Sequence, residues 1–227
     1  MRRYSRPTEI LIWLVSATAL LLVLLGWLRH PSISLLSGLA AGIVLALYAW
    51  AGSRMALRFD GDDRASRLAL RSGLLAGLIF AAEIPLEYAF LPKDNNSFGL
   101  IEFGSVFAIY AAVGAINAIR AQPLRDAITG VVIAAVISSL LWCITLLTLF
   151  YLFEGTARQA SVLLSEGDFD DFRRSGMTSF ATFMVEDLFG AVFFHLLLAP
   201  FIAMILTSVS WLAATSLRSA FRRLSAR

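Results

Sequence analysis

The stretch that decides the fold runs from Ala127 to Phe153 and reads AITGVVIAAVISSLLWCITLLTLFYLF. At a rise of about 1.5 Å per residue, a helix over this stretch is about 40 Å long, whereas a bilayer core is about 30 Å thick. An apolar helix of that length crosses a membrane with room to tilt. The stretch therefore predicts a transmembrane helix.

Five more apolar runs resemble this one, and together they take over half of the 227 residues. The expected spans are 10–28, 32–51, 72–90, 99–119, 127–153 and 183–213. The chain is 59% hydrophobic, against about 45–50% in a typical soluble domain. We expect an all-α fold, an integral membrane bundle of about six transmembrane helices in a single polytopic domain, 1–227. The first run is longer than the apolar part of a signal peptide, so we interpret it as an uncleaved helix.

Basic residues are divided unevenly between the two sides of these spans. With a cytoplasmic N-terminus, fourteen fall on the cytoplasmic side and five on the other, and an excess of Lys and Arg marks cytoplasmic loops. The cytoplasmic set is Arg2, Arg3, Arg6, Arg54, Arg58, Arg64, Arg67, Arg71, Arg120, Arg125, Arg218, Arg222, Arg223 and Arg227, against Arg29, Lys93, Arg158, Arg173 and Arg174. We therefore expect both chain ends in the cytoplasm.

The arginines also indicate what surrounds the protein. They flank apolar runs, so the expected partner is the lipid bilayer, with anionic lipid at the cytoplasmic arginines, and nucleic acid is not expected. In the tail, Leu217, Phe221 and Leu224 share a helical face beside arginines. Only one of the 19 basic residues is a lysine, a bias that favours a GC-rich bacterial genome. We expect a multi-pass protein of the bacterial cytoplasmic (inner) membrane.

The longest outer connection, 154–182, has an amphipathic pattern. Ala160, Leu163 and Leu164 offer an apolar face, and acidic residues follow at Glu166 and Asp168. Such a segment is typical of a helix lying on the membrane surface. We expect it to lie there or to cap the bundle.

Several ionisable side chains lie inside the predicted spans. A charge at the bilayer centre costs at least about 2.5–3.5 kcal/mol on insertion scales, so residues that persist there are functional candidates. The candidate binding residues are Glu83, Glu87, Glu102, Asp187 and His195, with Glu186 beside them. Carboxylates suit protons and hard cations, and histidine adds a group that titrates near neutrality. The pattern does not indicate which metal, if any, they bind.

Helical rise gives each candidate an expected depth. Counted from the starts of their spans, Glu83 lies about 16 Å deep and His195 about 18 Å deep, both near the midplane. Glu102 lies about 5 Å below the outer surface by the same count. We expect that Glu83 and His195 could meet, with Glu87, Glu102 and Asp187 lining a route from outside. The alternative is that the outer carboxylates touch water or headgroups and that His195 makes a structural hydrogen bond.

Three functions stay open. Pro85 and Pro200 lie beside deep ionisable residues in the third helix of each half, and broken helices at matching positions indicate transporter sites. The first hypothesis is therefore a transporter or permease-like protein handling a cation or small polar solute, with Glu83 and His195 facing an internal cavity. The alternative is a non-catalytic membrane subunit or assembly factor, in a homo- or hetero-oligomer, with a filled bundle and a glycine-lined outer groove.

An intramembrane enzyme is the third hypothesis. The sequence contains no phosphate loop, no HExxH and no GxSxG, the motifs that carry mononucleotide binding, zinc proteolysis and serine hydrolysis. Cys143 is the only cysteine, which excludes an intrachain disulfide and argues against a thiolate metal cluster. We expect no cofactor and favour a protein that is not an enzyme.

Overall fold

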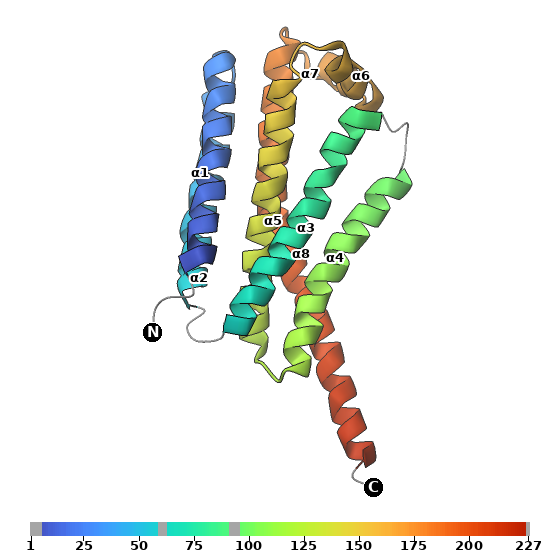
Figure 1. Ribbon diagram of the computed structural model, residues 1–227. Helices are drawn as coiled ribbons and strands as arrows, with labels where there is room; N and C mark the ends of the chain where they lie inside the picture. The colour runs from blue at the N-terminus through green and yellow to red at the C-terminus, as the bar shows by residue number, and fades with distance from the viewer. Residues whose placement is uncertain (1–5, 59–62, 91–95, 226–227) are drawn as a thin grey trace.

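Eight α-helices and short connections form the structure, a computed structural model that describes residues 6–58, 63–90 and 96–225. The described residues contain no strand. In chain order the helices are α1 (Arg6–Arg29), α2 (Leu35–Arg58), α3 (Asp63–Phe90), α4 (Asn96–Ile119), α5 (Leu124–Leu152), α6 (Ala157–Glu166), α7 (Asp168–Ser175) and α8 (Phe180–Ser225). Figure 1 shows the long helices side by side, with α6 and α7 across one end.

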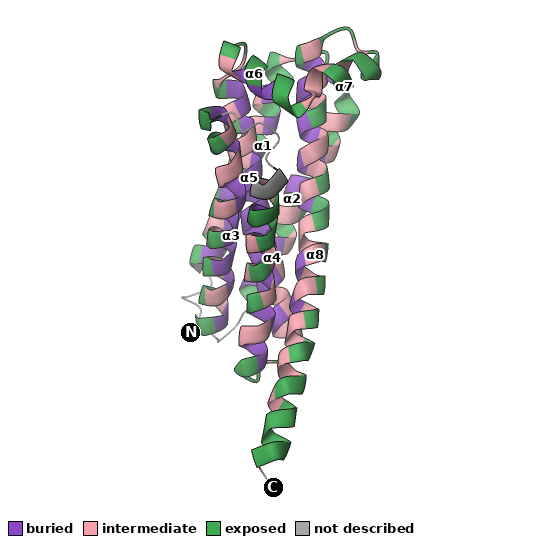
Figure 2. Ribbon diagram, turned by 90° about the vertical axis from the view of Figure 1, so that its right-hand side faces the viewer, coloured by how far each residue is buried: buried purple, intermediate pink, exposed green. Residues whose placement is uncertain are grey.

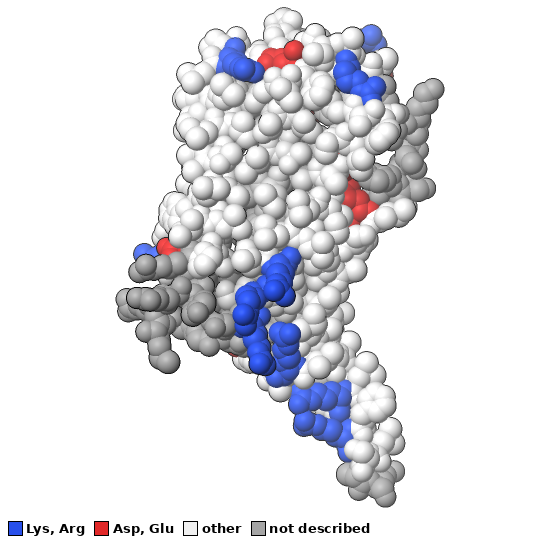
Figure 3. Space-filling model, viewed as in Figure 1, with Lys and Arg blue, Asp and Glu red and all other residues white. Residues whose placement is uncertain are grey.

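Six of the described helices, α1 to α5 and α8, are long and apolar enough to cross a membrane. This confirms the expected all-α membrane bundle of six helices. The free ends of α1 and α8 lie at the same end of the bundle (Figure 1). On the face shown in Figure 3, the larger arginine patches lie toward that end and smaller ones lie at the opposite end, with a broad belt of few charges between them. Four residues that count in the charge asymmetry lie outside the described residues: Arg2, Arg3, Lys93 and Arg227.

Helix α5 occupies the centre of the bundle. Its most apolar window is 78% buried, whereas the windows of the other five spans are 22–39% buried. It packs against α3, α8, α1, α4 and α2, and its inward residues include Val131, Ile137 and Leu147, all fully buried. Figure 2 shows the buried residues concentrated on the inward sides of the helices. The core is thus filled by one apolar helix, and the outer faces of the others remain for lipid.

Glycines allow the closest helix contacts. A Cβ on Gly73 would come within 2.9 Å of the Ala134 backbone in α5, and one on Gly77 within 3.0 Å of Ser138 Cα. On α4, a Cβ on Gly114 would lie 2.3 Å from the Thr207 carbonyl oxygen of α8. Small residues at such crossings let helix backbones approach in a membrane. The α3–α5 and α4–α8 contacts therefore depend on these glycines.

The segment after α5 folds into the short helices α6 and α7. Thr156 caps α6 by accepting a hydrogen bond from the Gln159 backbone N–H at 3.2 Å. Gly167 ends α6 in the left-handed conformation, with φ of 86°, a backbone that glycine adopts without steric cost. Arg158 Nε donates to the Tyr88 carbonyl oxygen of α3. These contacts attach α6 to the end of α3 and set Asp168 at the start of α7.

Helix α8 is much longer than a membrane core. Its 46 residues correspond to about 69 Å of helix, against a core of about 30 Å. Figure 1 shows its C-terminal part projecting beyond the other helices. Leu217, Phe221 and Leu224 are exposed there. The projecting part thus carries the apolar face and the arginines of the tail.

Candidate functional site

Two glutamates from neighbouring helices form the most unusual polar contact in the bundle. Glu102 of α4 is only 4% exposed, and among the described residues no donor group gives a hydrogen bond to either of its carboxyl oxygens. The polar group beside it is the Glu83 carboxyl of α3, within hydrogen-bonding range. A Cβ built on Gly99, one turn before Glu102, would lie 3.9 Å from Glu83 Oε1. The Glu83 side chain therefore points at the first turns of α4.

The chemistry of this pair follows from its composition. An ionised carboxylate only accepts hydrogen bonds, so two carboxyl groups bond to each other only when one carries a proton. Carboxyl groups that share one site do not both ionise easily, because like charges repel. No Lys, Arg or His among the described residues lies within 4.0 Å of either carboxyl. The arrangement suits a shared proton better than a fixed ion pair.

Glu87 extends the pair toward the α3 end that faces α6. It lies one turn beyond Glu83 on the same helical face and is partly buried. Its electrostatic neighbours are Glu166 and Glu83. The structure thus brings together Glu83, Glu87 and Glu102 of the predicted site residues.

His195 lies elsewhere on the same seam. Its ring stacks on Trp142 of α5, with centroids 3.9 Å apart and planes at 22°, and lies 5.4 Å from the Phe80 ring. Nδ1 lies 3.2 Å from the Ala191 carbonyl oxygen. Glu83 makes no ion pair with His195 within the described chain, although the two are close enough to interact electrostatically. The structure therefore places His195 among aromatic rings.

Glu186 and Asp187 lie near the start of α8, at the end of the bundle that α6 and α7 cover. Glu186 Oε1 accepts a hydrogen bond from the Ser34 backbone N–H at 2.6 Å, which joins α8 to the start of α2. Asp187 is exposed and lies near Asp168. Burial, followed by the negative charges of Asp187 and Glu166, raises the pKa of Asp168 to about 6. Glu186 thus has a structural partner, and Asp187 is apart from the carboxyl pair.

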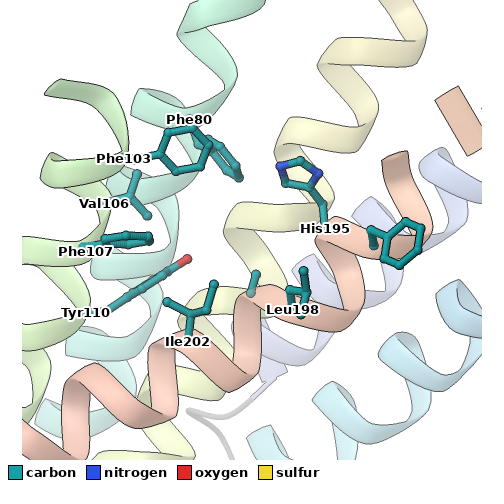
Figure 4. A pocket seen from close by; sticks show the side chains of 10 residues that line it. Phe80, Phe103, Val106, Phe107, Tyr110, His195, Leu198 and Ile202 are labelled. Atoms are coloured by element: carbon teal, nitrogen blue, oxygen red, sulfur yellow. The ribbon is translucent and has the colours of Figure 1, made fainter. Parts of the chain in front are cut away.

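A cavity of about 220 Å³ opens between α3, α4 and α8. Figure 4 shows the side chains of Phe80, Phe103, Phe107 and Tyr110 on one side and His195 with Leu198 on the other. Its full lining is Phe80, Phe103, Val106, Phe107, Tyr110, Phe194, His195, Leu198, Ala199 and Ile202. Glu83 and Glu102 are not among these residues. Glu83 and His195 were both expected to face an internal cavity, and of the two only His195 lines this one.

The sequence analysis did not identify the aromatic part of this site. Phe103, Phe107 and Tyr110 recur at helical spacing on α4, which indicates one aromatic face. A face of that kind looks the same in sequence whether it meets lipid, core or a cavity. The sequence did not mark Trp142 as a site residue, because it lies within a continuous apolar run.

Neither metal-ligand geometry nor similarity to known proteins identifies the function of this site. Within residues 6–58, 63–90 and 96–225, no group of three or more His, Cys, Asp or Glu side chains is arranged to hold a metal ion. Compared with protein-family models, curated proteins and solved structures, the chain matches none. Any function has therefore to be inferred from the side chains themselves.

Proposed function

We propose that this protein is a small membrane carrier that binds and releases a proton at the Glu83–Glu102 carboxyl pair. The observation that carries the proposal is Glu102, a 4% exposed carboxyl that receives no hydrogen bond from a donor group in the part of the chain that the structure describes. Burying an unpaired carboxylate costs free energy, whereas a protonated carboxyl donates a hydrogen bond to the carboxylate beside it. A proton shared between two carboxyls needs no further ligand, whereas Ca²⁺ and Mg²⁺ take six or more oxygen ligands.

The surroundings of the pair support proton handling. Glu87 is partly buried and lies one turn from Glu83, so it offers a route between the pair and water at the α6 end. Ionisable residues inside membranes mark proton relays in pumps and transporters. The adjoining cavity gives a carried solute a place to bind on the same α3–α4 seam.

Infrared spectroscopy of the purified protein in detergent tests this proposal. We expect a carbonyl band from a protonated carboxylic acid in the wild type, its loss in Glu102→Gln, and a shift in D2O. Glu186→Gln is the matched control, because that carboxylate already accepts a hydrogen bond from Ser34. A wild-type spectrum without such a band, or a band that both variants leave unchanged, contradicts the proposal. A band that never shifts in D2O also contradicts it, because a carrier site has to exchange with water.

The non-catalytic subunit remains a second candidate because of one surface. Gly38 of α2 has open space where a Cβ would be, and Leu35, Leu39 and Ile43 beside it are exposed. An exposed glycine among leucines favours close approach of another membrane helix. Gly38→Ile should then reduce the mass of the detergent-solubilised particle in light scattering. An unchanged mass would leave lipid as the partner of this face.

We further propose that the protein lies in a bacterial cytoplasmic membrane with both chain ends in the cytoplasm. The excess of arginine at the α1/α8 end of the bundle supports this orientation. Anionic lipid headgroups are then the proposed partners of Arg218, Arg222 and Arg223 on the projecting part of α8.

A further inference from the structure

Near the middle of α1, α2 and α5, three buried hydroxyl groups have no hydrogen-bond partner among the described residues. They are Ser16 Oγ, Tyr48 Oη and Ser139 Oγ, one from each helix. Ser16 is 4% exposed and Ser139 is 0% exposed, and the hydroxyl oxygen of Tyr48 is also buried. A buried polar group without a partner costs free energy, and the core of a membrane holds no bulk water to supply one. The three hydroxyls therefore need a partner that enters the bundle.

The three helices that carry these hydroxyls meet at one point. A Cβ on Gly52 of α2 would lie 3.3 Å from both Ile12 Cγ2 of α1 and Val136 Cγ1 of α5. Helices α1 and α5 run in the same direction, because an ion pair between Arg29 and Glu154 joins their far ends. Helix α2 follows α1 after a short connection and runs back. The directions of the three helices are thus known relative to this contact.

Each hydroxyl residue lies about one turn from this contact, toward the end that α6 and α7 cover. On α1, Ser16 follows Ile12 by four residues, and on α5, Ser139 follows Val136 by three. On α2, which runs the other way, Tyr48 precedes the glycine by four residues. Steps of three and four residues stay on one face of a helix. The three hydroxyls therefore come from one level of the bundle, which is about 20 Å from either end of α5.

Ser16 and Ser139 differ from other hydroxyl residues on the same two helices. Thr18 of α1 donates to the Leu14 carbonyl oxygen at 2.9 Å, and Thr145 of α5 donates to the carbonyl oxygen four residues before it at 3.0 Å. Such a bond to its own backbone satisfies a hydroxyl inside a helix. Ser16 and Ser139 do not make it, so their hydroxyls are left to bind a ligand.

Water is the ligand that this chemistry fits. The three hydroxyls make no hydrogen bond to one another, and each of them can donate and accept. A buried water molecule typically makes about three hydrogen bonds, to groups that have no other partner. A metal cation would bring a charge into the core, which is costly without a carboxylate. The electrostatic neighbour of Tyr48 is another phenol, Tyr110, whose hydroxyl already bonds to Ser138.

We propose that ordered water binds inside this bundle and is shared by the hydroxyls of Ser16, Tyr48 and Ser139. The water adds hydrogen bonds between α1, α2 and α5 at a level where the neighbouring contact, that of Ile12 and Val136, is apolar. This site goes beyond the proposed function, and it stands whether or not the carboxyl pair carries a proton.

Radiolytic labelling of the full-length protein in lipid nanodiscs tests the proposal. A short X-ray pulse converts bound water into hydroxyl radicals, which add to the nearest side chains, and mass spectrometry locates the products. We expect Tyr48 to be hydroxylated although its hydroxyl oxygen is buried, with the exposed Phe221 as the reference for bulk water. Ser16→Ala/Ser139→Ala should lose the label on Tyr48, because two of the three groups that hold the water are gone.

The matched control is Thr18→Val/Thr145→Val, which removes two hydroxyls from the same helices, each bonded to its own backbone. This variant should label Tyr48 as the wild type does. An unlabelled Tyr48 in the wild type overturns the proposal, and that measurement needs no variant to fold. Equal labelling of Tyr48 in Ser16→Ala/Ser139→Ala and wild type overturns it as well. Labelling that changes when choline chloride replaces sodium chloride would assign the level to a cation and overturn it too.

Discussion

Gly114 is the position where one added methyl group should disturb the bundle most. A Cβ there would lie 2.3 Å from the Thr207 carbonyl oxygen, and real Cβ atoms keep at least 3.0 Å from their neighbours. The obstacle is backbone of α8, which no side-chain rotation removes. Gly114→Ala therefore has to push α4 and α8 apart until that distance reaches about 3.0 Å or more.

The magnitude follows from what the separation breaks. Thr207 Oγ1 donates to the Tyr110 carbonyl oxygen at 2.8 Å, and Ser210 Oγ donates to that of Ala111 at 2.7 Å. Interhelical hydrogen bonds in membranes are worth about 0.6 kcal/mol each, and overpacking costs about 1–3 kcal/mol. Alanine regains about 0.8–1 kcal/mol of helix propensity over glycine. The net loss in the free energy of unfolding is then about 1–3 kcal/mol.

Gly104 supplies the matched control on the same helix. A Cβ there meets nothing within 4 Å, so Gly104→Ala should stabilise by up to about 1 kcal/mol through helix propensity alone. Equilibrium unfolding in a denaturing detergent, followed by circular dichroism, measures both variants against the wild type. Gly114→Ala as stable as Gly104→Ala would refute the proposed close contact between α4 and α8.

Three further predictions concern other parts of the chain. Glu83→Gln and His195→Phe should change the free energy of unfolding additively, within about 0.5 kcal/mol, because no ion pair joins the two residues. A larger difference between the double variant and the sum of the single variants would show that Glu83 and His195 interact after all. The pKa of Asp168 is raised to about 6, above its unfolded value of about 3.9, so its protonation favours the folded state and stability falls as pH rises through about 4 to 6. Asp168→Asn should therefore raise the melting temperature at pH 7.5 and leave it unchanged at pH 4, and an equal rise at both pH values would contradict this. In a cysteine-free background, an impermeant thiol reagent should label Ser161→Cys from outside intact cells and Arg125→Cys only after lysis, and the opposite pattern would reverse the proposed orientation.

The helices could be predicted from the sequence because each of the six is a long apolar run. The filled centre could not, because α5 differs from the other spans mainly in what surrounds it. Gly73 and Gly77 illustrate the same limit. Their spacing indicates a face for close helix packing, but only the structure shows that α5 occupies that face. Periodicity therefore predicts which face of a helix is packed, but it does not predict which other helix packs against that face.

The pairing of Glu83 with Glu102 was within reach of the sequence. Counted from the starts of their predicted spans, the two lie at different depths. Counted instead from the α3–α4 connection that they share, Glu83 lies seven residues before the end of α3 at Phe90, and Glu102 six residues after the start of α4 at Asn96. Both counts give about 10 Å of helix. Antiparallel neighbours joined by a short connection align from that connection, and this count predicts the pair.

Glu83 and His195 make no ion pair for a different physical reason. Their estimated depths in the membrane could not reveal it. Phe80 lies one turn before Glu83 on α3, and its ring packs near both His195, at 5.4 Å, and Trp142, at 5.6 Å. The same ring meets Phe103, the residue after Glu102, edge-on at 5.4 Å and 66°. Phe80 and Phe103 thus line the cavity, and each is within one turn of a member of the carboxyl pair in the sequence. The space beside His195 is thus taken by aromatic rings, and Glu83 has the Glu102 carboxyl as its polar neighbour instead.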